Sequence, residues 1–158
     1  MKKIALLTCF GLALLLFGAA GQAQAKPNFT GQWKIDPAKS NLGGMPAPDV
    51  FDRTIEHNDP KLHVVTKQSG PQGERTTDVN YATDGSEVTN KMGQVEAKST
   101  AVWDGDALAI TTRIEFNGNK VEFKEKWTLS EDGKTMNAAL HVASPQGEFD
   151  GTIVLLKQ

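Results

Sequence analysis

The chain has 158 residues, a formal net charge of −2 and 39% hydrophobic residues. This length is typical of a single domain with one core. The acidic balance argues against nucleic acid as a partner, because binding to phosphate groups requires a basic face.

Residues 1–25 have the pattern of a secretory signal peptide. Two lysines precede an apolar run over residues 4–20, and Ala23-Gln24-Ala25 is a small-x-small cleavage site. Cleavage there would leave residues 26–158 and lower the net charge to −4, because it removes two lysines and no acidic residue. We therefore expect a periplasmic or secreted protein that consists of one β-barrel domain.

Cys9 is the only cysteine. Leu6-Leu7-Thr8-Cys9 resembles a lipoprotein cleavage box only superficially, because the cysteine precedes most of the apolar run that it should follow. An uncleaved anchor is the alternative, since 17 apolar residues are near the lower limit for a membrane span. Cleavage would remove Cys9 and leave no disulfide, no thiolate nucleophile and no cysteine metal ligand. No later stretch is long and apolar enough to cross a membrane.

Polar and apolar residues alternate with a period of two after residue 50, which is typical of half-exposed β-strands. Hairpin turn pairs recur at Asp84-Gly85, Asp104-Gly105, Asn117-Gly118 and Asp132-Gly133. The segments between turns are too short for crossover helices, so neighbouring strands should pair antiparallel. The predicted strands cover residues 29–36, 50–58, 61–69, 74–83, 86–91, 94–103, 107–116, 119–129, 134–143 and 147–157.

Each predicted strand has one apolar face. Over residues 119–129, Val121, Phe123 and Trp127 share one face, whereas Lys120, Glu122, Lys124 and Lys126 alternate with them and must face water. Closing the sheet on itself covers the apolar face and removes the exposed edges. We therefore predict an all-β fold, an antiparallel up-and-down meander barrel of 8–10 strands, whose interior can hold side chains or one small ligand.

Two segments resemble known families. Phe29-Thr30-Gly31-Gln32-Trp33-Lys34 resembles the first strand of the calycin superfamily, which includes lipocalins and fatty-acid-binding proteins. In that superfamily a Gly-x-Trp near the mature N-terminus plugs one end of the barrel. Residues Trp127 to Lys134 look like a hairpin of uncharacterised secreted bacterial lipocalin-like proteins. The resemblance implies a calycin-like barrel, with Trp33 over one end, and a general binding role.

The chain also departs from these families, so the resemblance carries no particular ligand. Residues 37–49 are too short and too rich in proline for the helical pair of fatty-acid-binding proteins. The last strand reads Ile153-Val154-Leu155-Leu156 and lacks the Arg-x-Tyr with which those proteins hold a carboxylate. The C-terminal helix usual in lipocalins and their frequent disulfide are missing.

Glu125 interrupts an otherwise apolar inward face between Phe123 and Trp127. A buried carboxylate must be paired, hydrogen-bonded or neutralised. Arg53 and Arg75, on inward faces of other predicted strands, are the candidate partners. Glu125 would then either anchor a ligand's head group or form a purely structural pair, or it would sit in water at the rim.

The candidate ligand site combines such polar groups with apolar ones, as small-molecule pockets do. The small inward residues are expected to leave room for a guest, because a filled barrel needs bulk at most inward positions. They are Ala97, Ser99, Ala101, Thr112 and Ala138. Large aromatic residues are first of all core, and they form a ligand wall only if the interior is not filled. The predicted ligand-binding residues are Arg53, Arg75, Tyr81, Ser99, Trp103, Thr112, Phe123, Glu125, Trp127 and Leu140.

Metal or catalytic chemistry has little support in the sequence. His57, His63 and His141 lie on three different predicted strands, and the last two face outward, whereas a metal or haem site needs convergent ligands. There is no Gly-x-Ser-x-Gly, phosphate loop or His-Glu-x-x-His. We expect no metal, no tightly held cofactor and no enzyme activity, but a monomeric module that binds a small hydrophobic or amphipathic molecule. An interaction or inhibitor protein that acts through its loops or outer face is the alternative, and an enzyme is the third class.

The cleavage site gives a direct prediction. The exported protein should begin at Lys26, because the small-x-small site ends at Ala25. Intact-mass spectrometry of the exported protein measures this. An acylated Cys9 at its N-terminus would show that the lipoprotein alternative is the right one.

Overall fold

The computed structural model describes residues 25–43, 48–71 and 73–158. The predicted signal peptide therefore lies outside the described residues, except for Ala25. The ten strands are β1 (Gly31–Ile35), β2 (Val50–Asn58), β3 (Lys61–Gly70), β4 (Gly73–Ala82), β5 (Val88–Met92), β6 (Val95–Asp104), β7 (Ala107–Phe116), β8 (Asn119–Leu129), β9 (Thr135–Ser144) and β10 (Gly147–Lys157). No helix capable of spanning a membrane occurs in the described ranges.

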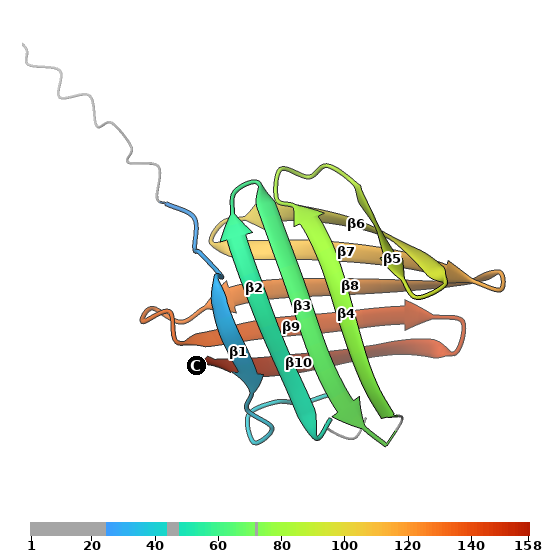
Figure 1. Ribbon diagram of the computed structural model, residues 1–158, viewed down its shortest axis with the longest axis horizontal. Helices are drawn as coiled ribbons and strands as arrows, with labels where there is room; N and C mark the ends of the chain where they lie inside the picture. The colour runs from blue at the N-terminus through green and yellow to red at the C-terminus, as the bar shows by residue number, and fades with distance from the viewer. Residues whose placement is uncertain (1–24, 44–47, 72) are drawn as a thin grey trace, which may run out of the picture.

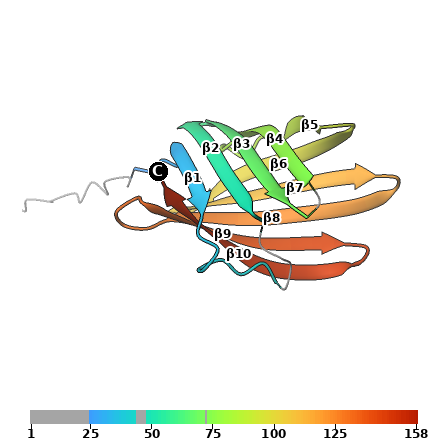
Figure 2. The same cartoon turned by 60° about the horizontal axis from the view of Figure 1, so that its bottom comes forward.

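The strands form one antiparallel sheet in the order β4-β3-β2-β1-β10-β9-β8-β7-β6-β5. Consecutive strands are neighbours except for β4 and β5, which stand at the two ends of this order. In addition, β1 pairs with β10 and so brings the first and last strands together. In Figure 1, β1 to β4 cross in front of β6 to β10 at a steep angle, and Figure 2 shows these two groups of strands facing each other. The prediction of an up-and-down meander barrel is confirmed.

The predicted strand boundaries agree with the structure to within two residues at each end. At the turn between β7 and β8, Asn117 has φ 52° and Gly118 has φ 75°. Two successive positive φ angles define the primed hairpin turn that an Asn-Gly pair favours. Turn chemistry thus fixed the registers that place the inward faces.

The barrel is nearly closed rather than fully closed, because no ladder joins β4 to β5. Instead, the side chain of Asn90 on β5 forms hydrogen bonds with the backbone of Asn80 on β4. Its Oδ1 accepts from the Asn80 N–H at 2.8 Å, and its Nδ2 donates to the Asn80 carbonyl at 2.9 Å. An isolated bridge between Asp84 and Val102 adds a second link across this side. The side-chain amide of Asn90 therefore satisfies the backbone N–H and C=O of Asn80. Without it, these two groups would have no partner, because β4 and β5 form no backbone hydrogen bonds with each other.

Aromatic side chains fill one end of the barrel. Phe29, which precedes β1, stacks on Trp103 at 6.1 Å between ring centroids and meets Trp127 edge-on at 5.7 Å. Trp33 is 1% exposed and donates its indole N–H to the Phe29 carbonyl at 2.9 Å. We call this the closed end. The expectation that Trp33 covers one end is confirmed.

Close packing explains why the first residue of the Gly-x-Trp motif is a glycine. Gly31 has φ 153°, and a Cβ there would lie 2.7 Å from the Lys157 Cε and 3.5 Å from the indole nitrogen of Trp33. The ammonium of Lys157 lies 5.3 Å from the centroid of the Trp33 ring. Glycine thus leaves space for the tryptophan and for the lysine that covers it.

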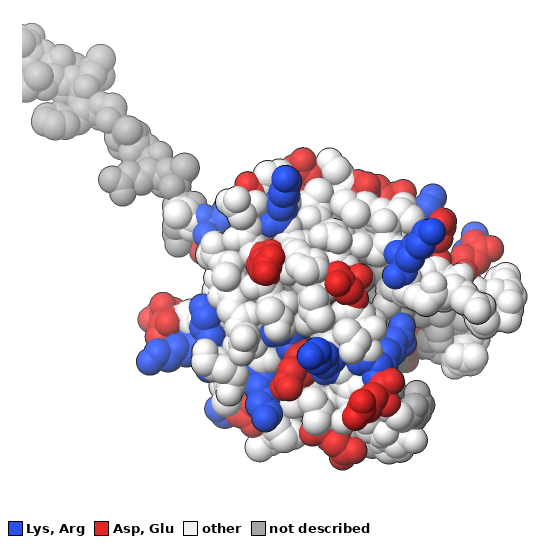
Figure 3. All heavy atoms as spheres, viewed as in Figure 1, with Lys and Arg blue, Asp and Glu red and all other residues white. Residues whose placement is uncertain are grey.

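The outer face is wet, as predicted. Lys124 pairs with Glu122 at 2.9 Å, and Lys126 pairs with Asp104 at 2.7 Å, all on the exterior. On the face seen in Figure 3, acidic and basic side chains are interspersed, with no basic stripe. Such pairs keep the surface soluble but contribute little to stability.

Trp33 provides a test of the closed end. Trp33→Ala should lower the free energy of unfolding by about 3–5 kcal/mol, because it removes a fully buried indole and its hydrogen bond. Phe116→Ala is the matched control: its ring is 56% exposed, so the change should stay within about 0.5 kcal/mol. Urea denaturation followed by circular dichroism measures both, and equal effects would contradict the assignment.

Candidate functional site

The barrel interior contains a cavity of about 500 Å³ at the end opposite the aromatic cluster. It lies between β1 to β4 on one side and β8 to β10 on the other. We call it the barrel cavity. Its lining is Ile35, Leu42, Pro48, Phe51, Gln68, Ser69, Gly70, Pro71, Gly73, Arg75, Phe123, Leu140, Val142, Phe149 and Ile153.

Inward alternation explains most of this lining. Phe51, Phe123, Leu140 and Phe149 are inward residues from the halves of their strands that lie away from the aromatic cluster. Leu42 and Pro48 come instead from the loop between β1 and β2, which a bridge from Asn41 to Thr152 ties to β10. In its described part this loop contains no helix, as expected from its prolines. The cavity thus has mainly apolar walls, to which two residues of this loop contribute.

A polar network lies one step deeper, between the cavity and the closed end. The Arg53 guanidinium donates to Glu125 Oε2 at 3.2 Å and, through Nε, to Thr66 Oγ1 at 3.3 Å. The Trp127 indole N–H donates to the same Glu125 oxygen at 2.7 Å. Between the two candidates for the Glu125 partner, the structure selects Arg53.

The guanidinium is also held by aromatic faces. Arg53 Cζ lies 4.9 Å from the centroid of Trp127 and 5.2 Å from that of Phe51. The side chain of Arg53 is 7% exposed and that of Glu125 is 20% exposed. A buried pair that is also hydrogen-bonded and stacked is costly to break, because removing one partner leaves a charge uncompensated.

Tyr81 extends this network toward β6 and β7. Burial, and to a lesser extent the negative charge of Glu125, raise the pKa of Tyr81 to about 12, although Arg53 and a hydrogen bond with Thr112 oppose the shift. Thr112 in turn shares a 2.9 Å hydrogen bond with Ser99. The neutral phenol is therefore the stable form inside the barrel.

The predicted site residues fall into three groups. Arg75, Phe123 and Leu140 line the barrel cavity. Six others form or adjoin the deeper network: Arg53, Tyr81, Ser99, Thr112, Glu125 and Trp127. Trp103 lies at the closed end against Phe29 and His57.

The small inward residues do not make the space that was expected of them. Ala97, Ala101 and Ala138 are all at most 1% exposed, and none of them lines the barrel cavity. Ala138 lies opposite Trp127 in the sheet register, and Ala101 is next but one to Trp103. Ala101 and Ala138 thus lie beside indole rings, and Ser99 and Thr112, which bond to each other, do not line the cavity either. The expectation that the small inward residues leave room for a guest was wrong. The cavity exists because the bulk is concentrated at the other end.

The sequence did not reveal the contacts that His57 makes at the closed end. Its Nδ1 accepts from the Phe29 backbone N–H at 3.3 Å, and its Nε2 lies 2.8 Å from Asp59 Oδ1. Burial alone would raise the pKa of Asp59, but hydrogen bonds from Thr83 and His57 outweigh it and hold the pKa below its ordinary value. The pair tethers the N-terminal segment to the closed end, so its role is structural.

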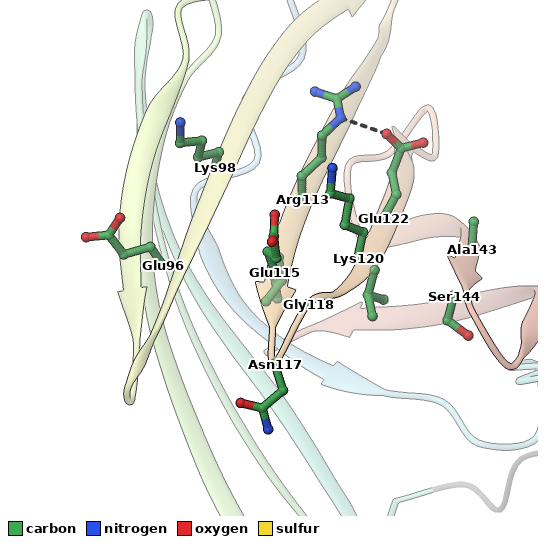
Figure 4. A pocket seen from close by; sticks show the side chains of 12 residues that line it. Glu96, Lys98, Arg113, Glu115, Asn117, Gly118, Lys120, Glu122, Ala143 and Ser144 are labelled. Atoms are coloured by element: carbon green, nitrogen blue, oxygen red, sulfur yellow. Dashed lines mark hydrogen bonds and ion pairs between the residues drawn. The ribbon is translucent and has the colours of Figure 1, made fainter.

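A larger hollow of about 880 Å³ lies outside the barrel, around the β7–β8 hairpin (Figure 4). Six charged residues line it: Glu96, Lys98, Arg113, Glu115, Lys120 and Glu122. Arg113 donates to Glu122 at 2.8 Å, which is the dashed contact in Figure 4. Three cations and three carboxylates make up half of its lining, so the hollow is less suited to a small hydrophobic ligand than the barrel cavity, which one charged residue lines.

No group of three or more potential metal ligands occurs in the part of the chain that the structure describes. His63 and His141 lie on the outer face, as predicted, where they contact Asp78 and Asp150 at 2.8 and 2.9 Å.

Comparisons with known proteins identify the fold. No protein-family model and no curated protein matches the chain. The fluorescent protein UnaG superposes with a TM-score of 0.57 at 17% identity, over 82% of this chain and 97% of UnaG. Zebrafish ileal bile-acid-binding protein in complex with cholic acid gives 0.53 at 15% identity, over 82% and 98%. Secretory abundant heat soluble protein 4 from Ramazzottius varieornatus gives 0.55 at 16% identity, over 86% and 99%.

The fold is calycin-like. The structural expectation drawn from the Gly-x-Trp segment is thereby confirmed. Identities this low establish the fold alone, so the ligand has to be argued from the cavity of this chain.

Tyr81 gives a spectroscopic test of the network. It is the only tyrosine, so ultraviolet absorbance reports its ionisation without interference from a second phenol. The folded protein should titrate with a midpoint at about pH 12 instead of about 10. Glu125→Gln should lower this midpoint, because it removes a negative charge that disfavours the phenolate, whereas Glu115→Gln on the outer face should leave it unchanged.

The same shift fixes the sign of a stability change. The pKa of Tyr81 in the folded protein is raised above its value in the unfolded chain. The contribution of the neutral phenol to the free energy of unfolding is therefore complete below pH 10 and is lost as the pH rises toward 12. A midpoint near 10 in the folded state would show that Tyr81 is not part of the buried network.

Proposed function

We propose that residues 26–158 are an exported, non-enzymatic protein that binds a small hydrophobic or amphipathic molecule in the barrel cavity. The observation that carries this proposal is the cavity itself: about 500 Å³ of apolar space at one end of a barrel whose other end is tightly packed. That volume lies in the range of about 300–1,000 Å³ that is usual for small-molecule sites.

Three further features support binding. The walls combine Phe51, Phe123 and Phe149 with aliphatic side chains, so most of the binding free energy would come from apolar surface, at about 25 cal/mol per Å² before binding costs. The Arg53–Glu125 network holds the floor of the cavity rigid before a ligand arrives. A similarly folded protein is named for binding bile acids and was solved with cholic acid.

Export remains part of the proposal. Lys26, the first residue after the predicted cleavage site, donates to the Gly105 carbonyl at 2.8 Å, and its ammonium lies 5.6 Å from the Trp103 ring centroid. These contacts involve only residues that cleavage would retain. Removal of residues 1–25 is therefore compatible with every contact described for the barrel, and we propose a periplasmic or extracellular location.

Ligand binding can be tested directly on the mature protein. Titration with fatty acids, retinoids, bile acids and apolar aromatic dyes should change indole fluorescence and raise the melting temperature for at least one class. If a broad panel changes neither, the binding proposal fails, and an interaction protein acting through its loops or outer face becomes the better hypothesis.

A filling variant shows whether the ligand occupies this cavity. Leu140→Trp adds an indole to the cavity wall and should weaken binding by at least about tenfold, because it takes up space that the guest needs. Val102→Trp is the matched control, since residue 102 is 47% exposed on the outer face. Isothermal titration calorimetry compares the two, and equal affinities would place the ligand elsewhere.

A further inference from the structure

Arg75 is the only charged residue that lines the barrel cavity among the described residues. It lies on β4 near the cavity mouth, opposite Gln68 in the sheet register, and its side chain is exposed. Within the described ranges it has no ion-pair or hydrogen-bond partner. Residues 44–47 and 72, which interrupt the described ranges, include no acidic side chain. Its charge is therefore available at the mouth.

The cation deeper in the barrel is in a different state. Arg53 is neutralised by Glu125 and further held by Thr66 and two aromatic rings. An anionic group that entered head first would have to compete with the Glu125 carboxylate for that guanidinium. It would also lose its hydration at the same time, and a desolvated unpaired charge is expensive.

The region between the two arginines is apolar. Phe51, Phe123, Val142 and Ile153 separate the mouth from the network. An alkyl chain gains free energy there, while a head group gains nothing. The cavity thus presents an uncompensated positive charge at its entrance, an apolar middle and a neutralised floor.

We propose that the barrel cavity selects single-chain amphiphiles with an anionic head group and binds them with the head at Arg75 and the tail toward the closed end. This inference rests on the proposed function and adds to it the charge and the orientation of the ligand. Guanidinium and carboxylate pair with favourable geometry, so Arg75 is the specificity-determining residue.

Charge selection is tested with three probes of equal chain length: dodecanoate, dodecanol and dodecylammonium. The wild-type protein should bind dodecanoate most tightly and dodecylammonium most weakly. Arg75→Gln should weaken dodecanoate binding by about fivefold, which is what an exposed ion pair supplies, and should leave dodecanol unchanged. Lys67→Gln, an exposed change on the outer face of β3, is the matched control and should affect neither probe.

Orientation is tested with bromine as a contact quencher of tryptophan. None of the three tryptophans lines the barrel cavity: Trp103 and Trp127 pack on Phe29, and Trp33 bonds to its carbonyl. With the head at the mouth, 12-bromododecanoate should quench indole fluorescence more than 2-bromododecanoate at equal saturation. The reverse order would overturn the orientation.

The outcomes separate this inference from the function on which it rests. If the three probes bind equally well and Arg75→Gln changes none of them, charge selection is wrong while ligand binding stands. If no probe in the wider panel binds, the proposed function fails, and this inference fails with it. If Arg75→Gln lowers dodecanol binding as strongly as dodecanoate binding, the residue shapes the cavity and does not read charge.

Discussion

The structure depends on a single constraint: a long antiparallel sheet with one apolar face has to cover that face and protect its edges. Ten strands with short turns cannot supply a second layer of helices, so the sheet covers itself. The pairing of β1 with both β2 and β10 closes one side with backbone hydrogen bonds. On the opposite side, the Asn90 amide replaces a ladder that the strands do not make. The shared interior is the result of this closure.

The interior is filled unevenly, and this asymmetry gives the protein its site. Large rings gather at the closed end: Phe29, Trp33, Trp103 and Trp127. Ala101 and Ala138 lie beside Trp103 and Trp127, whereas phenylalanine and aliphatic side chains line the open end without filling it. An interior packed densely throughout would leave no space for a guest. The same tryptophans that stabilise the barrel thus leave a cavity beyond the Arg53–Glu125 network.

Charge is distributed with a similar asymmetry. The deeper arginine has a carboxylate, a hydroxyl and two aromatic faces as partners, whereas the arginine at the mouth has solvent. Burial without Glu125 would make Arg53 costly, so Glu125 is first of all a structural partner. The unpaired arginine at the mouth is therefore the cation that a ligand's polar group can contact, and its position determines the orientation that we propose for an amphiphile.

The sequence by itself determined the strands, their order along the chain and which residues face inward. Period-two alternation and turn pairs such as Asn117-Gly118 are local signals, and a residue's face follows from counting along its own strand. The Gly-x-Trp segment indicated the closed end, because Gly31 is needed wherever Trp33 and Lys157 pack over the backbone. These features can be predicted because they depend on residues close in the sequence or on the alternation of faces along one strand.

Only the tertiary structure decided which inward residues meet across the barrel. The choice of Arg53 over Arg75 as the partner of Glu125 depends on strand crossing and register between β2 and β8, which lie far apart in the sheet. The small residues were inward as predicted, yet the side chains that fill the space beside them come partly from other strands, as Trp127 does for Ala138. Counting along one strand could therefore not locate the empty space. Leu42 and Pro48 belong to a segment without periodicity, so no pattern in the sequence could assign them to the lining. The position of a residue along its strand assigns its side chain to a face of the sheet. A cavity, in contrast, is the space that remains when side chains from distant parts of the chain do not fill the interior.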